Sequence, residues 1–290
     1  MDKSSPLFLF HQPKFIFRNP DASVMLFEHD SARIYFSRIG ESLISLDRAP
    51  FGGFVLGSDL KKNDLLSCLE KILSWSRSHG ATTVIIRSFP DAYHPECSAL
   101  IAETLLTTSY NVLYRDITQV IDVMRGDVSK LGVHKKRRIR TAESKGFQFR
   151  PLSLDWLEKS YALIVQSRVH KDYPITMTLG MLQDTFSLFP DEYMLFGVFD
   201  NERLIAASVS IRVNPEILYC FYIGDDLDYR SCSPVTFLVN GIYDFCKVNR
   251  FRLLDIGLST DKGTLNTGLY NFKKTFGAVD SYKLTFVRQT

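Results

Sequence analysis

The order of apolar and polar positions along the 290-residue chain predicts short strands separated by amphipathic helices, and this order occurs twice. Residues 54–60 read FVLGSDL and residues 221–227 read FYIGDDL, each an apolar run that ends at a glycine and a short acidic turn. A helical pattern and a second strand follow each run, LLSCLEKILSWSRSHG with ATTVIIRS and VTFLVNGIYDFCKVN with RFRLLDIG. The sequence therefore predicts an internal duplication.

The correspondence between the two copies continues through another helix and strand, residues 99–123 in the first copy and the segment ending in VDSYKLTFV in the second. Gly80 and Asn249 are expected to end the preceding helices, because both residue types tolerate a left-handed conformation. Under a constant offset, Lys273 falls opposite Leu106. The first copy then has no counterpart of this lysine, which favours the second copy as the one that carries chemistry.

Two β-rich runs joined by Asp200 and Asn201 predict a hairpin ahead of the second copy, and ARIYFSRI with ESLISL predicts a weaker one ahead of the first. Helical stretches are expected near 155–170 and 178–188. Hairpins that feed strand–helix–strand units imply an α/β fold with a mixed, α+β type of sheet. We expect the chain to have three parts. These are a degenerate N-terminal domain at 1–125, a basic connecting helix at 126–146, and a C-terminal domain at 147–290 that holds the active site.

Composition narrows the class of protein. A hydrophobic fraction of 45% and a charged fraction of 23% are typical of a soluble globular chain, and a net charge of +3 does not indicate a DNA-binding protein. The five cysteines contain no CxxC pair and the six histidines no HxH or HExxH spacing, so no metal is expected. With no apolar run long enough for a signal peptide or a membrane span, we expect a cytoplasmic protein.

The layout resembles the GNAT acyltransferase fold, and two such domains joined by the basic segment KKRRIRTAESKG resemble the FemABX family and its acetyltransferase-like relatives. RAPFGGF, DYRSCSP, LLDIGLS and above all GLYNFKKTFG carry the resemblance. It implies a transferase in which two GNAT-like domains arose by duplication. The chain departs from GNAT enzymes in the loop that holds the pyrophosphate of acetyl-CoA, because DDLDYRSCSP lacks the glycines and offers three carboxylates against Arg230.

The segment 267–278, TGLYNFKKTFGA, contains the two residues for which we expect a catalytic role. In a helix, Leu269, Phe272 and Phe276 form one apolar stripe, and Tyr270 and Lys273 are neighbours beside it. The resemblance implies that Lys273 points into the substrate cleft and that Tyr270 is a proton donor. The structural alternative is a lysine and a tyrosine that only border a packed stripe.

Other residues are candidates for binding the donor or the acceptor. Arg230 is expected to hold a phosphate or carboxylate, or else to pair with Asp226 or Asp228. Asp255 and Ser259 alternate on one strand and face the acyl channel in the resemblance, although an aspartate there can also cap a turn. The full set of candidates is Arg230, Ser233, Tyr222, Asp255, Ser259, Phe272, Phe51, Gly52 and Gly53.

Phe51, Gly52 and Gly53 are expected either to line an acceptor cleft or to form a tight turn before a strand. In the connecting helix, five cations within HKKRRIR are either a solvated face or a contact to phosphate or RNA. These cations are Lys135, Lys136, Arg137, Arg138 and Arg140.

Three functions remain open from the sequence. The first is an N-acyltransferase that moves an acyl group from acyl-CoA or another acyl thioester to a small-molecule or peptide amine bound between the domains. The second is a peptidyltransferase that uses aminoacyl-tRNA and acts on a cell-wall precursor or peptide. The third is a non-catalytic relic of the fold that acts as a binding module.

Overall fold

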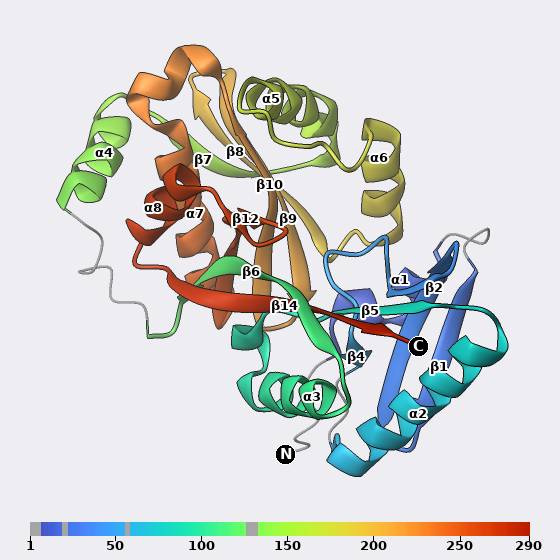
Figure 1. Cartoon of the computed structure of the whole chain (residues 1–290). Helices are drawn as coiled ribbons and strands as arrows, with labels where there is room; N and C mark the ends of the chain where they lie inside the picture. The colour runs from blue at the N-terminus through green and yellow to red at the C-terminus, as the bar shows by residue number, and fades with distance from the viewer. Residues whose placement is uncertain (1–6, 19–22, 56–58, 126–132) are drawn as a thin grey trace. The chain divides into compact units, whose positions relative to one another are not determined.

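The computed structural model describes residues 7–18, 23–55, 59–125 and 133–290. The chain forms two compact units that interleave along the sequence (Figure 1). Unit 1 consists of Met1–Thr118, Leu258–Thr267 and Asp280–Thr290, and unit 2 of Gln119–Gly257 and Gly268–Val279. These units describe compactness rather than duplication, so the domain boundaries expected from the sequence stay a prediction.

The sheet of unit 1 has the order β1-β2-β3-β5-β14, and the short β4 pairs with β2. Neighbours are antiparallel except β3 and β5, which are parallel. The strands are β1 (Val24–His29), β2 (Ala32–Ile39), β3 (Ser42–Ser45), β4 (Phe54–Val55), β5 (Thr83–Arg87) and β14 (Val279–Gln289). The late strand β14 therefore completes a sheet whose other strands come from the first third of the chain.

Helix α2 (Lys62–Ser78) packs on β1 and β2, and α3 (Pro95–Thr107) packs on α2. The short α1 (Pro13–Ile16) follows a 3-10 turn at Leu9–His11, and a second turn, η2 (Asp91–Tyr93), precedes α3. Strand β6 (Asn111–Asp122) has its first eight residues in unit 1 and its last four in unit 2. Unit 1 also contains an aromatic core. In this core Phe51 contacts Phe8, Phe10, Phe89 and Tyr93 edge to face.

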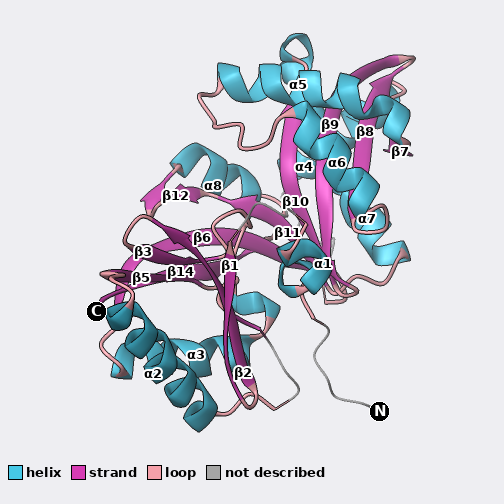
Figure 2. Cartoon of the chain, turned by 90° about the vertical axis from the view of Figure 1, so that its right-hand side faces the viewer, coloured by secondary structure: helices cyan, strands magenta, loops and turns pink. Residues whose placement is uncertain are grey.

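The sheet of unit 2 has the order β11-β10-β9-β8-β7, with β10 and β11 parallel and the other pairs antiparallel (Figure 2). Its strands are β7 (Gln148–Leu152), β8 (Tyr193–Asp200), β9 (Arg203–Asn214), β10 (Ile217–Asp225) and β11 (Leu253–Leu258). Leu218 and Cys220 of β10 join one core, whereas Gly224 leaves room for Ile164 on the other face. A bulge between Cys220 and Tyr222 shifts the alternation between the two faces.

Among its described residues, unit 2 contains five α-helices. They are α4 (Val133–Ser144), α5 (Leu157–His170), α6 (Leu179–Leu188), α7 (Pro234–Val248) and α8 (Thr267–Lys274). Helices α5 and α7 lie on opposite sides of the sheet, and α4 packs on α7 (Figure 1). A small pair, β12 (Thr260–Asp261) and β13 (Thr264–Leu265), lies between β11 and α8 in the sequence.

Most of the predicted elements are confirmed: both hairpins, the two helices ahead of the second copy, and the repeated strand–helix–strand order. Gly80 has the expected positive φ of 66°, but Asn249 does not, and Arg250 takes the left-handed conformation instead with φ of 60°. Leu56, Gly57 and Ser58, part of the first repeat motif, lie outside the described residues, as does the predicted start of the connecting helix at 126–132. Gly146 ends α4 as predicted, with φ of 79°.

The predicted correspondence of Lys273 with Leu106 is wrong. Leu106 is 53% exposed, whereas Lys273 is 5% exposed. Equivalent positions of duplicated helices face the same core, so the two helices are not related by the constant offset. The repeated order of the elements is observed. The first copy, however, cannot be said to have lost a lysine at Leu106, because Leu106 is not the counterpart of Lys273.

Candidate active site

The candidate site begins where strands β10 and β11 stop pairing. Their parallel pairing covers three residue pairs and ends at Tyr219 and Asp255. The bulge of β10 follows directly, between Cys220 and Tyr222, and Gly257 of β11 has a φ of 85°. Both strands therefore depart from regular geometry at the same level, which is a common arrangement beside active sites.

Helix α8 places Lys273 at this point. Its Nζ donates a hydrogen bond of 2.7 Å to the carbonyl oxygen of Gly257, and the side chain is buried. Asp255 is buried as well, and its Oδ1 accepts a hydrogen bond of 2.7 Å from the amide of Gly257. The amide of Gly257 in β11 is thus bonded to a carboxylate and its carbonyl oxygen to the amino group of a lysine.

Burial lowers the pKa of Lys273 to about 7, and the nearby Asp255 carboxylate and Cys220 thiol partly offset this effect by favouring the charged form. A lysine with a pKa near 7 exchanges its proton at neutral pH. Such a group can stabilise developing negative charge or transfer a proton.

The space around Gly257 is filled by neighbouring atoms. A Cβ atom built at this position would lie 3.3 Å from the carbonyl oxygen of Cys220 and 3.8 Å from both Lys273 Nζ and a ring carbon of Tyr219. Tyr219 is not among the candidates predicted from the sequence. The position of the bulge, which decides which of the aromatic residues of β10 face this point, leaves no signal in the apolar pattern.

Tyr270 lies one helical turn before Lys273 and is half-buried. Its carbonyl oxygen accepts a hydrogen bond of 3.3 Å from Gln119 Nε2, and the ammonium group of Lys274 lies 5.6 Å from its ring centre. Phe272 is directed elsewhere, because its ring lies 4.1 Å from the Nζ of Lys135. Of the residues on α8, Lys273 is therefore the one that the described contacts bring to Asp255 and Gly257.

The loop after β10 carries Arg230 and Ser233. Arg230 pairs with Asp225 at 3.6 Å, not with Asp226 or Asp228 as the sequence alternative had it. The latter two carboxylates pair with Arg203, at 2.7 and 3.3 Å. The predicted excess of carboxylates over cations at this loop, with Arg230 as the single cation, is therefore wrong. Cations from α5 and β9 also pair with these carboxylates.

Asp225 is the buried centre of this loop. Ser167 Oγ and Lys171 Nζ donate to its Oδ1 at 2.6 and 2.7 Å. Burial by itself raises the pKa of Asp225, but these hydrogen bonds and the charges of Lys171 and Arg230 outweigh it, so the pKa is lowered. Asp225 is therefore ionised, and its hydrogen bonds connect the end of β10 to the C-terminal end of α5.

The amides of the same loop bind to the loop itself and to β9. The amides of Asp226, Asp228, Tyr229 and Ser233 each donate to a protein oxygen, at 2.9 to 3.1 Å. Ser233 has a φ of 55°, and Pro234, which has no N–H, begins α7. A pyrophosphate held by backbone amides at a helix N-terminus needs free donors, and these four amides are not free.

Two further candidates have structural partners. The hydroxyl of Tyr222 accepts hydrogen bonds from the amides of Thr176 and Met177, at 2.9 and 3.0 Å, and the residue is buried. Ser259 comes after the end of β11 and belongs to unit 1, where its amide donates to the carbonyl oxygen of Ile117 at 2.8 Å. The structure does not bring either residue to Lys273 through a described contact.

Phe51, Gly52 and Gly53 lie in the core of unit 1. Phe51 is fully surrounded by aromatic rings, and a Cβ atom on Gly52 would overlap the backbone of Ser45. Gly53 has a φ of 74°, which favours glycine. These residues lead into β4 with a bend at Gly53, and their expected role at an acceptor cleft stays a prediction.

The basic segment forms helix α4, and its five cations do not share one environment. Arg137, Arg138 and Arg140 are exposed and Lys136 is half-buried. Lys135 is 3% exposed, with its Nζ 3.1 Å from the ring centre of Phe276. The solvated face therefore consists of the arginines, and Lys135 is part of the core of unit 2.

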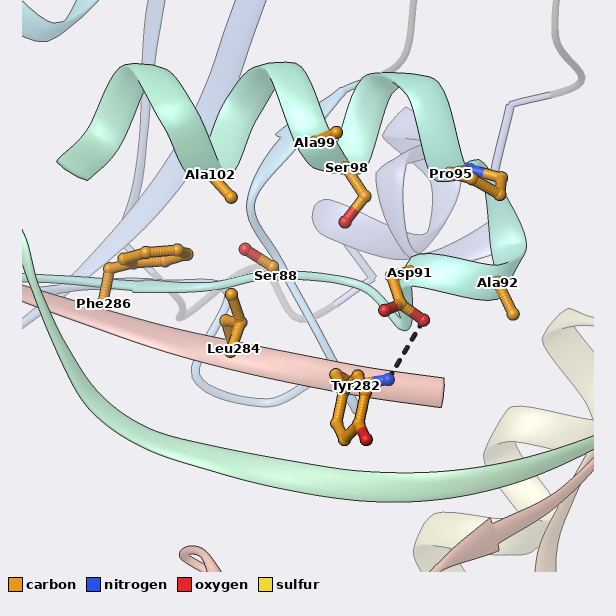
Figure 3. Close-up of a pocket in the computed structure, with 10 residues that line it drawn as sticks. All are labelled: Ser88, Asp91, Ala92, Pro95, Ser98, Ala99, Ala102, Tyr282, Leu284 and Phe286. Carbon is orange, nitrogen blue, oxygen red and sulfur yellow. Dashed lines mark hydrogen bonds between the residues drawn. The ribbon is translucent and has the colours of Figure 1, made fainter. Parts of the chain in front are cut away.

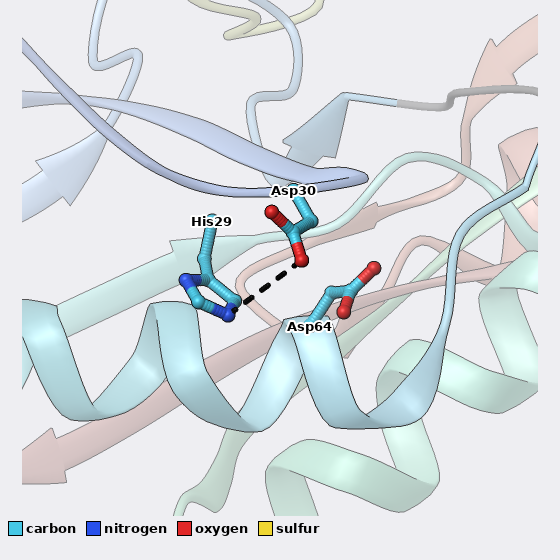
Figure 4. Close-up of side chains that lie close together, drawn as sticks. All are labelled: His29, Asp30 and Asp64. Atoms are coloured by element: carbon cyan, nitrogen blue, oxygen red, sulfur yellow. Dashed lines mark ion pairs between the residues drawn. The ribbon is translucent and has the colours of Figure 1, made fainter.

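One cluster of possible metal ligands occurs among the described residues, away from Lys273 in the sequence. His29, Asp30 and Asp64 lie at the turn between β1 and β2 and at the start of α2, with ligand atoms within 4.8 Å of one another (Figure 4). Asp64 Oδ2 already accepts hydrogen bonds from the amide and hydroxyl of Ser31. The absence of a metal stays a prediction.

The fold is that of tandem GNAT-like proteins, as the resemblance predicted. FemX is similar at 11% identity, covering 97% of this chain and 92% of that chain with a TM-score of 0.70. The C-terminal domain of a putative lysylphosphatidylglycerol synthetase from Agrobacterium fabrum is similar at 12% identity, covering 95% and 86%, with a TM-score of 0.65.

A tandem GNAT protein from the clavulanic acid biosynthesis pathway is similar at 10% identity, covering 89% and 79%, with a TM-score of 0.54. No family model and no curated protein matches the sequence. In the part of the chain that the structure describes, every helix is too short or too polar to cross a membrane.

Proposed function

We propose that the chain is an acyltransferase that moves an aminoacyl group from an activated ester to an amine, with Lys273 at the reaction centre. The observation that carries this proposal is the geometry of Lys273, a buried lysine with a pKa of about 7 that is held at 2.7 Å from Gly257 O where β10 and β11 stop pairing. The similarity to FemX and to a protein named for lysylphosphatidylglycerol supports an aminoacyl group as the one transferred.

In this reaction the amine nitrogen forms a bond to the ester carbonyl carbon, and the bond from that carbon to the leaving oxygen then breaks. Negative charge develops on the carbonyl oxygen, and a proton passes from the nitrogen to the leaving oxygen. The ammonium form of Lys273 stabilises the oxyanion. Because its pKa is near 7, Lys273 can also give its proton to the leaving oxygen and regain one from the amine. Tyr270 is the second proposed proton donor.

The choice of an ester over a CoA thioester rests on the loop after β10. Four of its amides are already bonded to protein oxygens, and it has no glycine that would allow a pyrophosphate to approach. Tyr219, Lys273 and the backbone of Cys220 also crowd the point where a pantetheine chain would pass between β10 and β11. Aminoacyl-tRNA is the ester donor that we propose, with a small-molecule or peptide amine as acceptor.

An acyl thioester is the second candidate. The observation in its favour is that β10 and β11 pair over only three residues, so the strands do part beyond Tyr219 and Asp255. An assay that supplies the protein with both aminoacyl-tRNA and an acyl thioester distinguishes the two candidates.

The first experiment compares Lys273→Met with Lys274→Met, which changes a lysine one position along that is exposed. Bulk tRNA charged with radiolabelled amino acids and a set of acyl-CoA esters are supplied with a panel of primary amines. We expect transfer from charged tRNA, a decrease in kcat of about 100-fold or more for Lys273→Met, and a change of less than about twofold for Lys274→Met.

Unchanged turnover in Lys273→Met would refute the role of the lysine. Transfer from acyl-CoA with none from charged tRNA would replace the first donor by the second. Thermal melts of both variants check that each is folded.

The second experiment addresses the RNA. Exposed arginines on α4 make salt-dependent contacts to phosphates in this proposal, and the triple change of Arg137, Arg138 and Arg140 to Gln removes them. We expect weaker tRNA binding and a shallower dependence of log K on log salt. The matched control changes three exposed cations of α2, Lys62, Lys71 and Arg77, to Gln, and an equal loss in the control would assign the binding to net charge alone.

A further inference from the structure

A cavity of about 420 Å³ lies in unit 1, between α3 and the strand β14. The turn η2 closes one end of it, and the side chains of Ser88, Asp91 and Ser98 point into the space between the helix and the strand (Figure 3). Its volume is within the range of small-molecule sites. None of the residues proposed for acyl transfer lines this cavity.

Asp91 is held in a fixed orientation. Its Oδ1 accepts hydrogen bonds from Ser281 Oγ at 2.7 Å and from the amide of Tyr282 at 3.0 Å. Ser281 Oγ in turn accepts a hydrogen bond of 3.0 Å from the amide of Ala92. Because both hydrogen bonds to the carboxylate use Oδ1, the second carboxylate oxygen has no hydrogen-bond partner among the described residues.

The rest of the lining is apolar or neutral. Ala92, Pro95, Ala99 and Ala102 are small and leave the space open on the side of α3, and Leu284 and Phe286 form the floor on the side of β14 (Figure 3). Ser88 Oγ and Ser98 Oγ likewise have no hydrogen-bond partner among the described residues. Tyr282 forms the rim, where the guanidinium of Arg115 lies 4.7 Å from its ring centre.

A lining with one carboxylate selects for charge. An anionic ligand would be repelled by Asp91, and a neutral one would gain no charge-assisted hydrogen bond. A primary ammonium group can donate to Asp91 Oδ2 and to the hydroxyl oxygens of serine. The small apolar surfaces then suit a short hydrocarbon body.

We propose that this cavity of unit 1 binds a small primary amine, with its ammonium group at Asp91 and its hydrocarbon part between α3 and the Leu284–Phe286 segment. The inference is independent of the proposed function, because the test measures binding with no acyl donor present.

The probes are phenethylamine, 2-phenylethanol and 3-phenylpropionate, which present a cation, a neutral group and an anion on the same hydrocarbon body. Binding to the full chain is measured by titration calorimetry and ligand-observed NMR. We expect phenethylamine to bind with a dissociation constant below about 1 mM and the other two at least about tenfold more weakly.

Two variants test the site. Asp91→Asn removes the charge but keeps an oxygen that can accept from Ser281 and Tyr282, and Ala102→Leu fills the cavity. Each should weaken phenethylamine binding by about tenfold or more. The matched control is Glu96→Gln, which removes a carboxylate in the first turn of α3 that does not line the cavity.

The proposal is overturned if phenethylamine does not bind up to about 10 mM, if 2-phenylethanol binds as tightly, or if both Asp91→Asn and Ala102→Leu bind like the parent chain. Thermal melts establish that each variant is folded. If Asp91→Asn does not fold, the Ala102→Leu variant and the three probes still decide the question.

Discussion

Lys273 and Lys274 are neighbours in the sequence with opposite environments. Lys273 is buried and bonded to Gly257 O, whereas Lys274 is exposed. The sequence pattern placed Lys273 beside a helical stripe of Leu269, Phe272 and Phe276, but α8 ends at Lys274, so Phe276 lies beyond the helix. The sequence did not show that Lys273 is more buried than Phe272, because that depends on how far the helix end tilts toward β11.

The chemistry proposed for Lys273 predicts a pH dependence. The ammonium form of Lys273 is lost as the pH rises through its pKa of about 7, so kcat should decrease above pH 7. In Lys273→Arg the guanidinium remains protonated, and the rate, although lower, should stay constant from pH 7 to 9. Methoxyamine is a suitable acceptor for the assay, since it is already neutral at pH 6.

A Lys273→Arg profile that still falls above pH 7 would assign the titration to another group. Lys274→Met serves as the control here too, because its profile should match that of the parent chain.

Helix α4 is the element whose role the sequence described least well. Its end at Gly146 and its positive charge could be inferred from the residues, and the end is confirmed, whereas the predicted start lies outside the described residues. The burial of Lys135 against Phe272 and Phe276 could not, because it requires knowledge of which helix packs on α4. The described residues offer the Nζ of Lys135 no hydrogen-bond partner.

This contact predicts an unusual effect on stability. Burial, with a smaller effect from the charge of Arg138, lowers the pKa of Lys135 to about 6. In the unfolded chain the pKa is near 10.4. Between these values the unfolded chain holds a proton that the folded chain lacks, so the free energy of unfolding rises with pH.

Lys135→Met keeps the length of the side chain and removes the ionisable group. We expect it to raise the free energy of unfolding at pH 7 by about 1–3 kcal/mol. From pH 7 to 8.5 the parent chain should gain on the variant by up to about 1.4 kcal/mol per pH unit. Urea unfolding at several pH values measures both effects, and curves that stay parallel would exclude a neutral buried lysine. Lys136→Met, on the same turn and less buried, is the control.

For the strands, too, the apolar pattern of the sequence locates most elements but does not show how they pair and pack in detail. The alternation of apolar residues located β8, β9, β10 and β11, and β8 pairs with β9 as the predicted hairpin. The bulge in β10 is a one-residue irregularity, and the sequence pattern continues through it without a break. Strands β1 and β7 were not predicted, since edge strands with one exposed face carry a weaker apolar signal.

For the molecule as a whole, the resemblance predicted the fold correctly. It did not predict that the two units interleave along the sequence. The chain passes from one unit to the other after Thr118, Gly257, Thr267 and Val279. Strand β14 pairs with β5 from Thr285 opposite Arg87 to Gln289 opposite Thr83. Such contacts between residues far apart in sequence leave no trace in local patterns.

Removing residues 280–290 should therefore destabilise unit 1 and not unit 2. Phe286, fully buried on β14, contributes to the core of unit 1, and the deletion also removes one of the two strands that pair with β5. Hydrogen exchange followed by mass spectrometry should show loss of protection in β5 and α3, with β9 and α7 unchanged. Protection of β5 that survives the deletion would contradict the assignment of β14 to unit 1.

The position of β14 in the sequence also sets the order in which the two units can form during synthesis on the ribosome. Unit 2 is complete once Val279 has been made, whereas unit 1 still lacks β14, the second of the two strands that pair with β5. The unit that begins the chain is thus the second to finish. Until then, the open edge of β5 presents unpaired backbone groups, which makes the nascent chain a candidate client for chaperones at that stage.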